Sequence, residues 1–174
     1  MNIVLIGYRG SGKTTIGRRL ANQLWKTFVD VDREACRRFG IDSIAEIWRV
    51  HGEPAWRATE VDVVREAMEG DEQVIALGGG TLMQPAAREA VEGAASTRRI
   101  YLYCEPETLH RRIETDPASS ATRPNLTQLG GGVEEIRTML AEREPVYRAV
   151  ADVVFDVTHL DPEDAVRRLV SQYL

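Results

Sequence analysis

The stretch that decides the fold spans residues 7–14 and reads Gly7-Tyr8-Arg9-Gly10-Ser11-Gly12-Lys13-Thr14. It matches the phosphate-binding pattern G-x-x-x-x-G-K-[S/T] at every fixed position. An apolar run over residues 2–6 precedes it and predicts a buried strand, and apolar residues at helical spacing over residues 14–24 follow it. The alternative is a chance glycine-rich turn, which has no reason to fall between a strand and a helix. The stretch therefore predicts a P-loop.

The chemistry of phosphate binding explains the composition of this loop. Glycines let the backbone curl so that successive N–H groups face a β-phosphate, and the N-terminus of the next helix adds partial positive charge. Lys13 is placed to reach the β- and γ-phosphates, and the Thr14 hydroxyl to ligate Mg²⁺. We expect ATP and Mg²⁺ to bind here, with the nucleotide contacted by Gly10, Ser11, Gly12, Lys13, Thr14 and Thr15.

The bulk composition limits the class of protein. The chain has 174 residues, 43% of them hydrophobic and 28% charged, as expected of one globular domain. Its formal net charge of -5 argues against a nucleic-acid partner, which needs a basic surface. Residues 1–13 do not resemble a signal peptide and no apolar stretch reaches transmembrane length, so we expect a cytoplasmic protein with no membrane partner. The only two lysines, Lys13 and Lys26, leave no Asn-Lys-x-Asp motif of a GTPase.

Alternating apolar runs and helical patterns define the expected fold. Strands are predicted over residues 2–6, 27–30, 73–77, 99–104 and 152–156. Helices are predicted over residues 14–24, 32–39, 53–69, 85–91, 105–115 and 133–149, after a capping box at Ser43, and from Pro162. This order predicts a three-layer α/β fold, with a five-stranded parallel sheet, helices on both faces and ligands beyond the carboxyl ends of the strands. Residues 116–132 are rich in Pro, Ser, Thr and Gly and predict a mobile, lid-like loop.

The sequence Asp30-Val31-Asp32 stands at the end of the second predicted strand. Residues i and i+2 of a strand share a face, so we expect both carboxylates to point towards the mouth of the P-loop. One would hold Mg²⁺, directly or through water, and the other would orient an acceptor hydroxyl and take its proton. The alternative is a polar strand end that caps the next helix. These residues alone leave both interpretations open.

Six motifs in order carry a resemblance to a known family: GYRGSGKTTIGRRLA, FVDVD, GEPAWRATE, ALGGGT, TRPNL and AEREPVYRAVAD. With these motifs the sequence resembles the shikimate kinases over essentially its whole length. The resemblance implies a fold like that of the P-loop nucleoside-monophosphate kinases, in one domain of residues 1–174. Residues 32–69 would form the substrate-binding helices and residues 112–132 the lid. It also implies transfer of the γ-phosphate of ATP to the 3-hydroxyl of shikimate, in the route to chorismate and the aromatic amino acids.

The resemblance also assigns roles to individual residues. Asp30 resembles the Mg²⁺-associated aspartate, and Asp32 the aspartate that grips the substrate hydroxyls and is the candidate base. The remaining assignments are carboxylate-binding Arg57 and Arg143, the substrate-contacting loop Gly78, Gly79 and Gly80, the lid arginine Arg123, and Pro162 beside the adenine. The catalytic set is then Asp32, Lys13 and Arg123. The implied partners are shikimate and ATP alone, with the protein a monomer.

The residues by themselves leave alternatives to these roles. Glu60 lies three residues after Arg57 on a predicted helix and would orient its guanidinium, but without the family match a solvated arginine is the simpler interpretation. Arg143 has the same alternative, and Arg123 could belong to a loop surface. A gluconate or nucleoside-monophosphate kinase of similar fold is the nearest rival function. A binding module without catalytic activity is the rival of another class.

Overall fold

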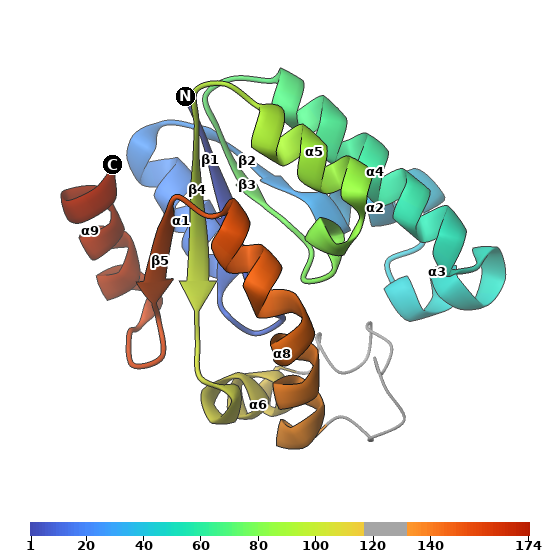
Figure 1. Cartoon of the computed structure of the whole chain (residues 1–174). Helices are drawn as coiled ribbons and strands as arrows, with labels where there is room; N and C mark the ends of the chain where they lie inside the picture. Colours follow the sequence, from blue (N-terminus) through green and yellow to red (C-terminus); the bar gives the residue numbers. More distant parts are fainter. Residues whose placement is uncertain (117–131) are drawn as a thin grey trace.

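The computed structural model of the chain describes residues 1–116 and 132–174, and within them a single parallel sheet (Figure 1). Its five strands lie in the order β2-β3-β1-β4-β5. The bounds are β1 Asn2–Ile6, β2 Thr27–Asp30, β3 Gln73–Ala76, β4 Thr97–Tyr103 and β5 Val153–Asp156. The predicted five-stranded parallel sheet is confirmed, with β4 beginning two residues earlier than residue 99, where we expected it.

Helices cover both faces of the sheet, as predicted (Figure 1). The helices α1 and α9 pack together on one face, and α4, α5 and α8 cover the other. Their bounds are α1 Lys13–Leu24, α2 Val31–Phe39, α3 Ile44–His51, α4 Glu53–Glu69, α5 Pro85–Gly93, α6 Pro106–Thr115, α8 Val133–Val150 and α9 Pro162–Tyr173. A short 3-10 helix, η1, spans Thr81–Met83.

Two helix starts follow the capping chemistry that the sequence indicates. The Ser43 hydroxyl accepts a hydrogen bond from the Glu46 amide at 3.3 Å and begins α3. The Asp161 carboxylate accepts from the Asp164 amide at 2.8 Å, and Pro162 is the first residue of α9. None of the helices in the described ranges combines the length and the apolar character needed to cross a membrane.

The central strand fixes where ligands can bind. All of β1 is buried, because β3 and β4 flank it and helices cover both of its faces. The chain leaves β1 through α1 towards β2 on one side, and it later reaches β4 and β5 on the other side. The strand order therefore reverses at β1, and the carboxyl end of this strand is the switch point at which ligands of open α/β sheets bind.

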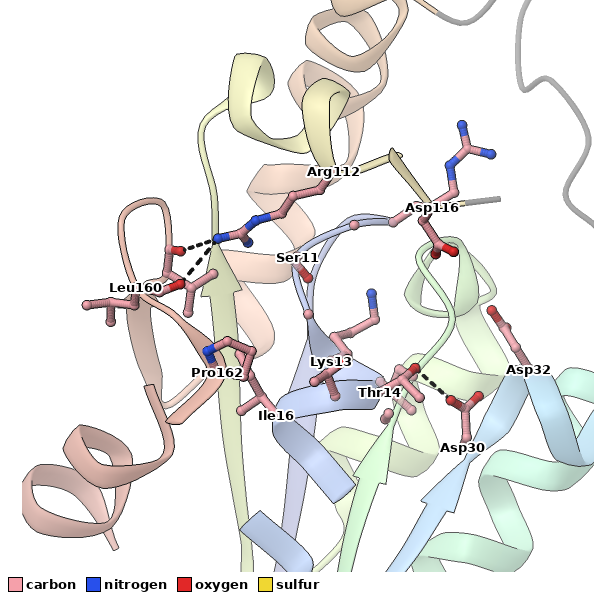
Figure 2. A pocket seen from close by; sticks show the side chains of 17 residues that line it. Ser11, Lys13, Thr14, Ile16, Asp30, Asp32, Arg112, Asp116, Leu160 and Pro162 are labelled. Atoms are coloured by element: carbon pink, nitrogen blue, oxygen red, sulfur yellow. Dashed lines mark hydrogen bonds between the residues drawn. The ribbon is translucent and has the colours of Figure 1, made fainter. Parts of the chain in front are cut away.

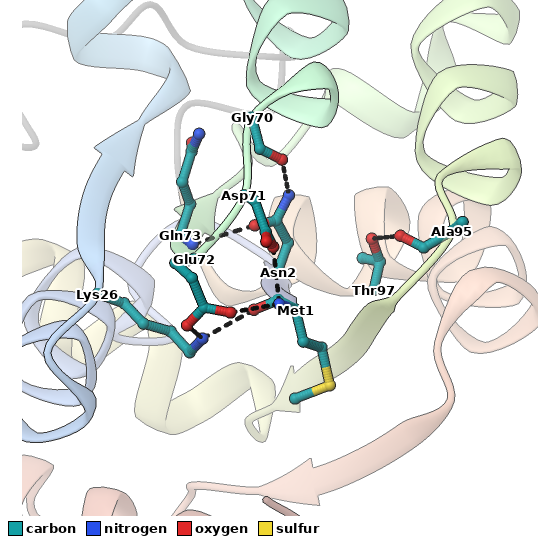
Figure 3. Close-up of polar contacts among 9 residues, drawn as sticks. All are labelled: Met1, Asn2, Lys26, Gly70, Asp71, Glu72, Gln73, Ala95 and Thr97. Carbon is teal, nitrogen blue, oxygen red and sulfur yellow. Dashed lines mark hydrogen bonds and ion pairs between the residues drawn. The ribbon is translucent and has the colours of Figure 1, made fainter.

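At the opposite, amino end of the sheet, the buried Asn2 side chain joins two segments (Figure 3). Its Nδ2 donates to the Gly70 carbonyl at 2.7 Å, and its Oδ1 accepts from the Gln73 amide at 3.0 Å. These bonds fix the turn between α4 and β3 against the start of β1. The adjacent Thr97 hydroxyl makes only a local bond, to the Ala95 carbonyl at 3.2 Å.

Replacing Asn2 by alanine leaves the partly buried Gly70 carbonyl and Gln73 amide without their partners. We expect Asn2→Ala to lower the free energy of unfolding by about 1–3 kcal/mol. Thr97→Val is the matched control on the neighbouring strand and should change it by less than about 0.5 kcal/mol. Urea unfolding followed by circular dichroism measures both changes, and equal losses in the two variants would contradict this role of Asn2.

Candidate active site

Residues 7–12 connect β1 to α1 and adopt a backbone that depends on glycine. Gly10 has a φ of 84° and Gly12 a φ of 94°, in the region that side chains disfavour. Gly12 also caps α1, so the loop leads directly into the N-terminus of a helix of 12 residues. Backbone N–H groups at such a helix end attract anions. The predicted P-loop is confirmed in its conformation and its context.

Lys13 is held within this loop. Its side chain is buried, and its Nζ donates to the Gly7 carbonyl at 2.8 Å and to the Tyr8 carbonyl at 2.9 Å. Figure 2 shows Lys13 between Ser11 and Thr14, with its ammonium group directed into the adjoining cavity. A positive charge therefore stands where the phosphates of a nucleotide would lie.

A cavity of about 550 Å³ opens around the P-loop (Figure 2). It is lined by Arg9, Gly10, Ser11, Gly12, Lys13, Thr14, Thr15, Ile16, Asp30, Asp32, Ala76, Leu77, Arg112, Asp116, Val157, Leu160 and Pro162. Pro162 and Leu160 lie at one end and Asp30 and Asp32 at the other (Figure 2). All the residues predicted to contact the nucleotide line this cavity, except Arg123, which lies outside the described residues. We call this space the nucleotide cavity.

Thr14 and Asp30 form the part of this cavity that suits a divalent cation. The Thr14 hydroxyl donates to Asp30 Oδ2 at 2.8 Å, and Asp30 Oδ1 accepts from the Arg33 amide at 3.2 Å. A hydroxyl and a carboxylate are hard oxygen donors of the kind that Mg²⁺ prefers. In the described part of the chain, no three His, Cys, Asp or Glu side chains gather into a metal site. The Thr14 hydroxyl and the Asp30 carboxylate would suit Mg²⁺, which usually keeps several waters and binds nucleotide phosphates as well.

The prediction that Asp30 and Asp32 share the face of a strand is wrong, whereas the helix predicted over residues 32–39 is confirmed and begins one residue earlier, at Val31. Asp30 ends β2 and immediately caps α2, so Asp32 lies in the first turn of a helix instead of on the face of a strand. The helix-capping interpretation of Asp30 is therefore confirmed. Both carboxylates still line the nucleotide cavity, because α2 begins at the carboxyl edge of the sheet.

The glycine loop of residues 78–80 lies where charged groups crowd the backbone. A Cβ atom on Gly78 would lie 2.3 Å from Asp32 Oδ1 and 2.7 Å from Glu60 Oε1. A Cβ atom on Gly80 would lie 2.9 Å from Arg57 Nη1. Side chains at either position would displace these groups. The loop is thus free of side chains because the chain's own charged residues approach it closely.

Arg57, on α4, is held by two carboxylates and an aromatic ring. Its Nη1 donates to Glu60 Oε2 at 2.8 Å and its Nε to Glu53 Oε1 at 3.2 Å. Its guanidinium carbon lies 5.5 Å from the centre of the Trp48 ring. The predicted orientation of Arg57 by Glu60 is confirmed, and the solvated alternative is wrong because the side chain is only 18% exposed.

Glu60 is a buried carboxylate, with 1% of its side chain exposed. Its Oε1 accepts a hydrogen bond from the Thr81 hydroxyl at 2.5 Å. Burial raises the pKa of Glu60, the nearby charge of Asp32 raises it further, and Arg57 and the Thr81 hydroxyl oppose both effects. Glu60 therefore joins Arg57 to Thr81 and, electrostatically, to Asp32.

Arg143, on α8, is buried, so the alternative interpretation of an exposed arginine is wrong. Its guanidinium carbon lies 5.7 Å from the centre of the Tyr8 ring. Its buried Nε has no hydrogen-bond partner among the described residues. One turn later, the Tyr147 hydroxyl donates to the Gly79 carbonyl, and burial raises the pKa of this hydroxyl to about 12. A buried arginine with a donor unused suits an anionic ligand.

A second, smaller cavity of about 60 Å³, the acceptor cavity, lies next to the first. It is lined by Arg9, Asp32, Ile44, Trp48, Trp56, Arg57, Glu60, Gly79, Gly80 and Arg143. A Cβ on Gly79 would lie 3.6 Å from Arg143 Nη1, so the guanidinium groups of Arg143 and Arg57 flank two consecutive glycines. Two such groups at one loop can bind a carboxylate. Of the predicted acceptor residues only Gly78 does not line this space.

Some residues of the two cavities were not predicted. Arg9 occupies a variable position of the P-loop pattern, so the motif gives no signal for it. The sequence indicated no role for Arg112 beyond the start of the expected lid, yet its Nη2 donates to the Val157 carbonyl at 2.9 Å and holds the segment before Pro162 beside the cavity (Figure 2). Trp48, which lines the acceptor cavity, and Tyr147, which lines neither cavity but bonds to the Gly79 carbonyl, are typical core residues by spacing. Only long-range contacts reveal what these side chains do.

Comparisons with known proteins agree with this geometry. The sequence model of the family described as shikimate kinase matches residues 9–174. The chain is 39% identical over 173 residues to the shikimate kinase of Nitrosococcus oceani, covering 99% of this chain and 86% of that protein.

Solved structures show the same relation. The shikimate kinase of Acinetobacter baumannii, in complex with shikimate, superposes with a TM-score of 0.87 at 32% identity, covering 98% of this chain and 90% of that one. A gluconokinase from Sinorhizobium meliloti superposes with a TM-score of 0.59 at 19% identity, covering 98% of this chain and 89% of that one, which shows a shared fold alone. Motif order, cavity geometry and sequence identity over nearly the whole length together place this chain in the shikimate kinase family.

Proposed function

We propose that this chain is a shikimate kinase that transfers the γ-phosphoryl group of ATP to the 3-hydroxyl of shikimate. The products are shikimate 3-phosphate and ADP. The observation that carries the proposal is the meeting of two cavities. One is built around a P-loop, and the other contains two buried or half-buried arginines beside a glycine loop. Asp32 lines both cavities, so it stands where a phosphoryl group would cross from one to the other.

ATP is held by the P-loop, with its base end towards Pro162 and its γ-phosphate towards Asp32. This direction follows because the apolar residues Leu160 and Pro162 lie at the end of the cavity away from the carboxylates (Figure 2). Lys13 and the N-terminus of α1 attract the phosphate oxygens. Thr14 and Asp30 are the residues that would hold Mg²⁺, which neutralises phosphate charge when bound.

Shikimate is an anion with a carboxylate and three hydroxyls, and the acceptor cavity offers a partner for each kind of group. Arg57 and Arg143 bind the carboxylate, and Asp32 orients the attacking hydroxyl. The hydroxyl oxygen attacks the γ-phosphorus in line, the bond to the bridging oxygen of ADP breaks, and Asp32 accepts the hydroxyl proton. Glu60 keeps Arg57 in the binding orientation and is a positioning residue.

Several expectations remain predictions. The lid over residues 112–132 and the closure of Arg123 over the phosphates concern residues that lie mostly outside the described ranges. The Mg²⁺ requirement, the monomeric state and the cytoplasmic location are also predictions. Gluconate and AMP remain the relevant rival acceptors.

Shikimate-dependent ADP release tests the reaction. In a coupled assay with MgATP we expect ADP release with shikimate and none above background with gluconate or AMP. Lys13→Met removes the charge beside the phosphates and should lower kcat by at least about 100-fold without unfolding the protein. Lys26→Met is the control, because Lys26 pairs with Glu72 at the opposite end of the sheet (Figure 3). Substantial turnover by Lys13→Met, or an acceptor other than shikimate, would refute the scheme.

The carboxylate role of Arg143 has its own test. Arg143→Ala should raise the KM for shikimate by about 10- to 100-fold, the value of a charged hydrogen bond, with a much smaller change for ATP. Shikimate methyl ester, which lacks the carboxylate charge, should be used equally poorly by the wild type and the variant. The control is Arg148→Ala, since Arg148 pairs with Glu144 at the surface of the same helix. Equal rises in KM for shikimate and ATP would argue against this role.

A further inference from the structure

Arg9 occupies a position that no other positively charged residue shares in the described part of the chain. Of the side chains that line the nucleotide cavity and the acceptor cavity, only Arg9 and Asp32 line both. Lys13 and Arg112 line the nucleotide cavity alone of the two, and Arg57 and Arg143 the acceptor cavity alone. Arg9 and Asp32 are therefore the residues at the boundary between the two cavities, one positively and one negatively charged.

The backbone fixes Arg9 at this boundary. It is the third residue of the P-loop, directly before Gly10, whose φ of 84° bends the chain. A Cβ on Gly79 would lie 3.4 Å from the Arg9 backbone nitrogen, so Arg9 lies across from the glycine loop. Its neighbour Tyr8 is buried under Arg143. Two of the four variable positions of this P-loop thus have different surroundings: Tyr8 supports an acceptor arginine, and Arg9 lies at the boundary between the cavities.

In phosphoryl transfer, a residue at this boundary stays close to the group that is transferred. The γ-phosphorus loses its bond to the bridging oxygen of ADP and gains one to the acceptor oxygen, so its three remaining oxygens stay near the boundary before and after transfer. Lys13, bonded to two carbonyls of its own loop, lines the nucleotide cavity and not the acceptor cavity. A guanidinium at the boundary can donate to these oxygens in substrate, transition state and product.

We propose that Arg9 is a catalytic residue that contacts the transferring phosphoryl group and still contacts it in shikimate 3-phosphate. This inference rests on the proposed shikimate kinase function. It assigns product-side phosphate binding to a residue that the P-loop pattern leaves variable. The competing interpretation is structural: Arg9 would only support the acceptor cavity by its charge, because that charge also acts on Tyr8.

The test compares two ligands that differ by one phosphate. Shikimate and shikimate 3-phosphate are titrated calorimetrically into the full chain carrying Arg9→Met, a neutral side chain of similar length. We expect shikimate 3-phosphate to bind at least about tenfold more weakly and shikimate within about threefold of the wild type. Arg9→Lys keeps the charge without the bidentate geometry and should recover part of the loss. In turnover, kcat should fall about 10- to 100-fold, with little change in the KM for shikimate.

Each other result overturns the inference. Equal weakening of both ligands shows that Arg9 only shapes the acceptor cavity, and unchanged binding of shikimate 3-phosphate shows no phosphate contact. Arg37→Met is the control for removing an arginine, since Arg37 pairs with Glu34 on the exposed side of α2. If the wild type binds neither ligand, the proposed function fails and this inference with it. If the wild type binds both and Arg9→Met matches it, this inference alone fails.

Discussion

The close approach of two backbones at the carboxyl end of the sheet is the constraint on which the site depends. A Cβ on Gly79 would lie 3.4 Å from the Arg9 nitrogen and 3.7 Å from the Gly7 carbonyl oxygen. The contact arises because β1 and β3 are neighbours, so that the P-loop and the glycine loop leave the sheet side by side. Next to them β2 ends in Asp30 and leads to Asp32. Three adjacent strands thus present phosphate-binding backbone, a loop without side chains, and carboxylates in that order.

The two arginines of the acceptor cavity differ in how they are held before a ligand binds. Arg57 is paired with the buried Glu60 and is oriented without a ligand, since Glu60 is itself fixed by Thr81. Arg143 is supported by the Tyr8 ring and keeps a buried Nε without a hydrogen-bond partner among the described residues. An anion bound between the two guanidinium groups would accept a hydrogen bond from Arg143 and leave the pairing of Arg57 with Glu60 unchanged. This difference explains why a chain with a net charge of -5 can bind two anionic substrates.

The sequence predicted the parts of this site that local chemistry dictates. The P-loop was predictable because its conformation requires Gly10 and Gly12, and α9 because Asp161 and Pro162 are an N-cap and a first helical residue. The pairing of Arg57 with Glu60 followed from helical spacing. The expectation that Asp30 and Asp32 share a strand face failed because Asp30 caps α2 directly, with no turn between the strand and the helix. Arg9 and Arg112 were missed because their roles depend on loops that meet only in the folded chain.

Direct passage of the phosphoryl group between two adjoining cavities is the central claim, and the stereochemistry at phosphorus tests it most directly. The chain is given shikimate and ATP made chiral at the γ-phosphorus with oxygen isotopes, and the configuration of shikimate 3-phosphate is determined by NMR. A single in-line transfer, with Asp32 and Arg9 at the boundary, predicts inversion of configuration. Retention would contradict it, because retention requires a second transfer through a phosphorylated side chain of the protein.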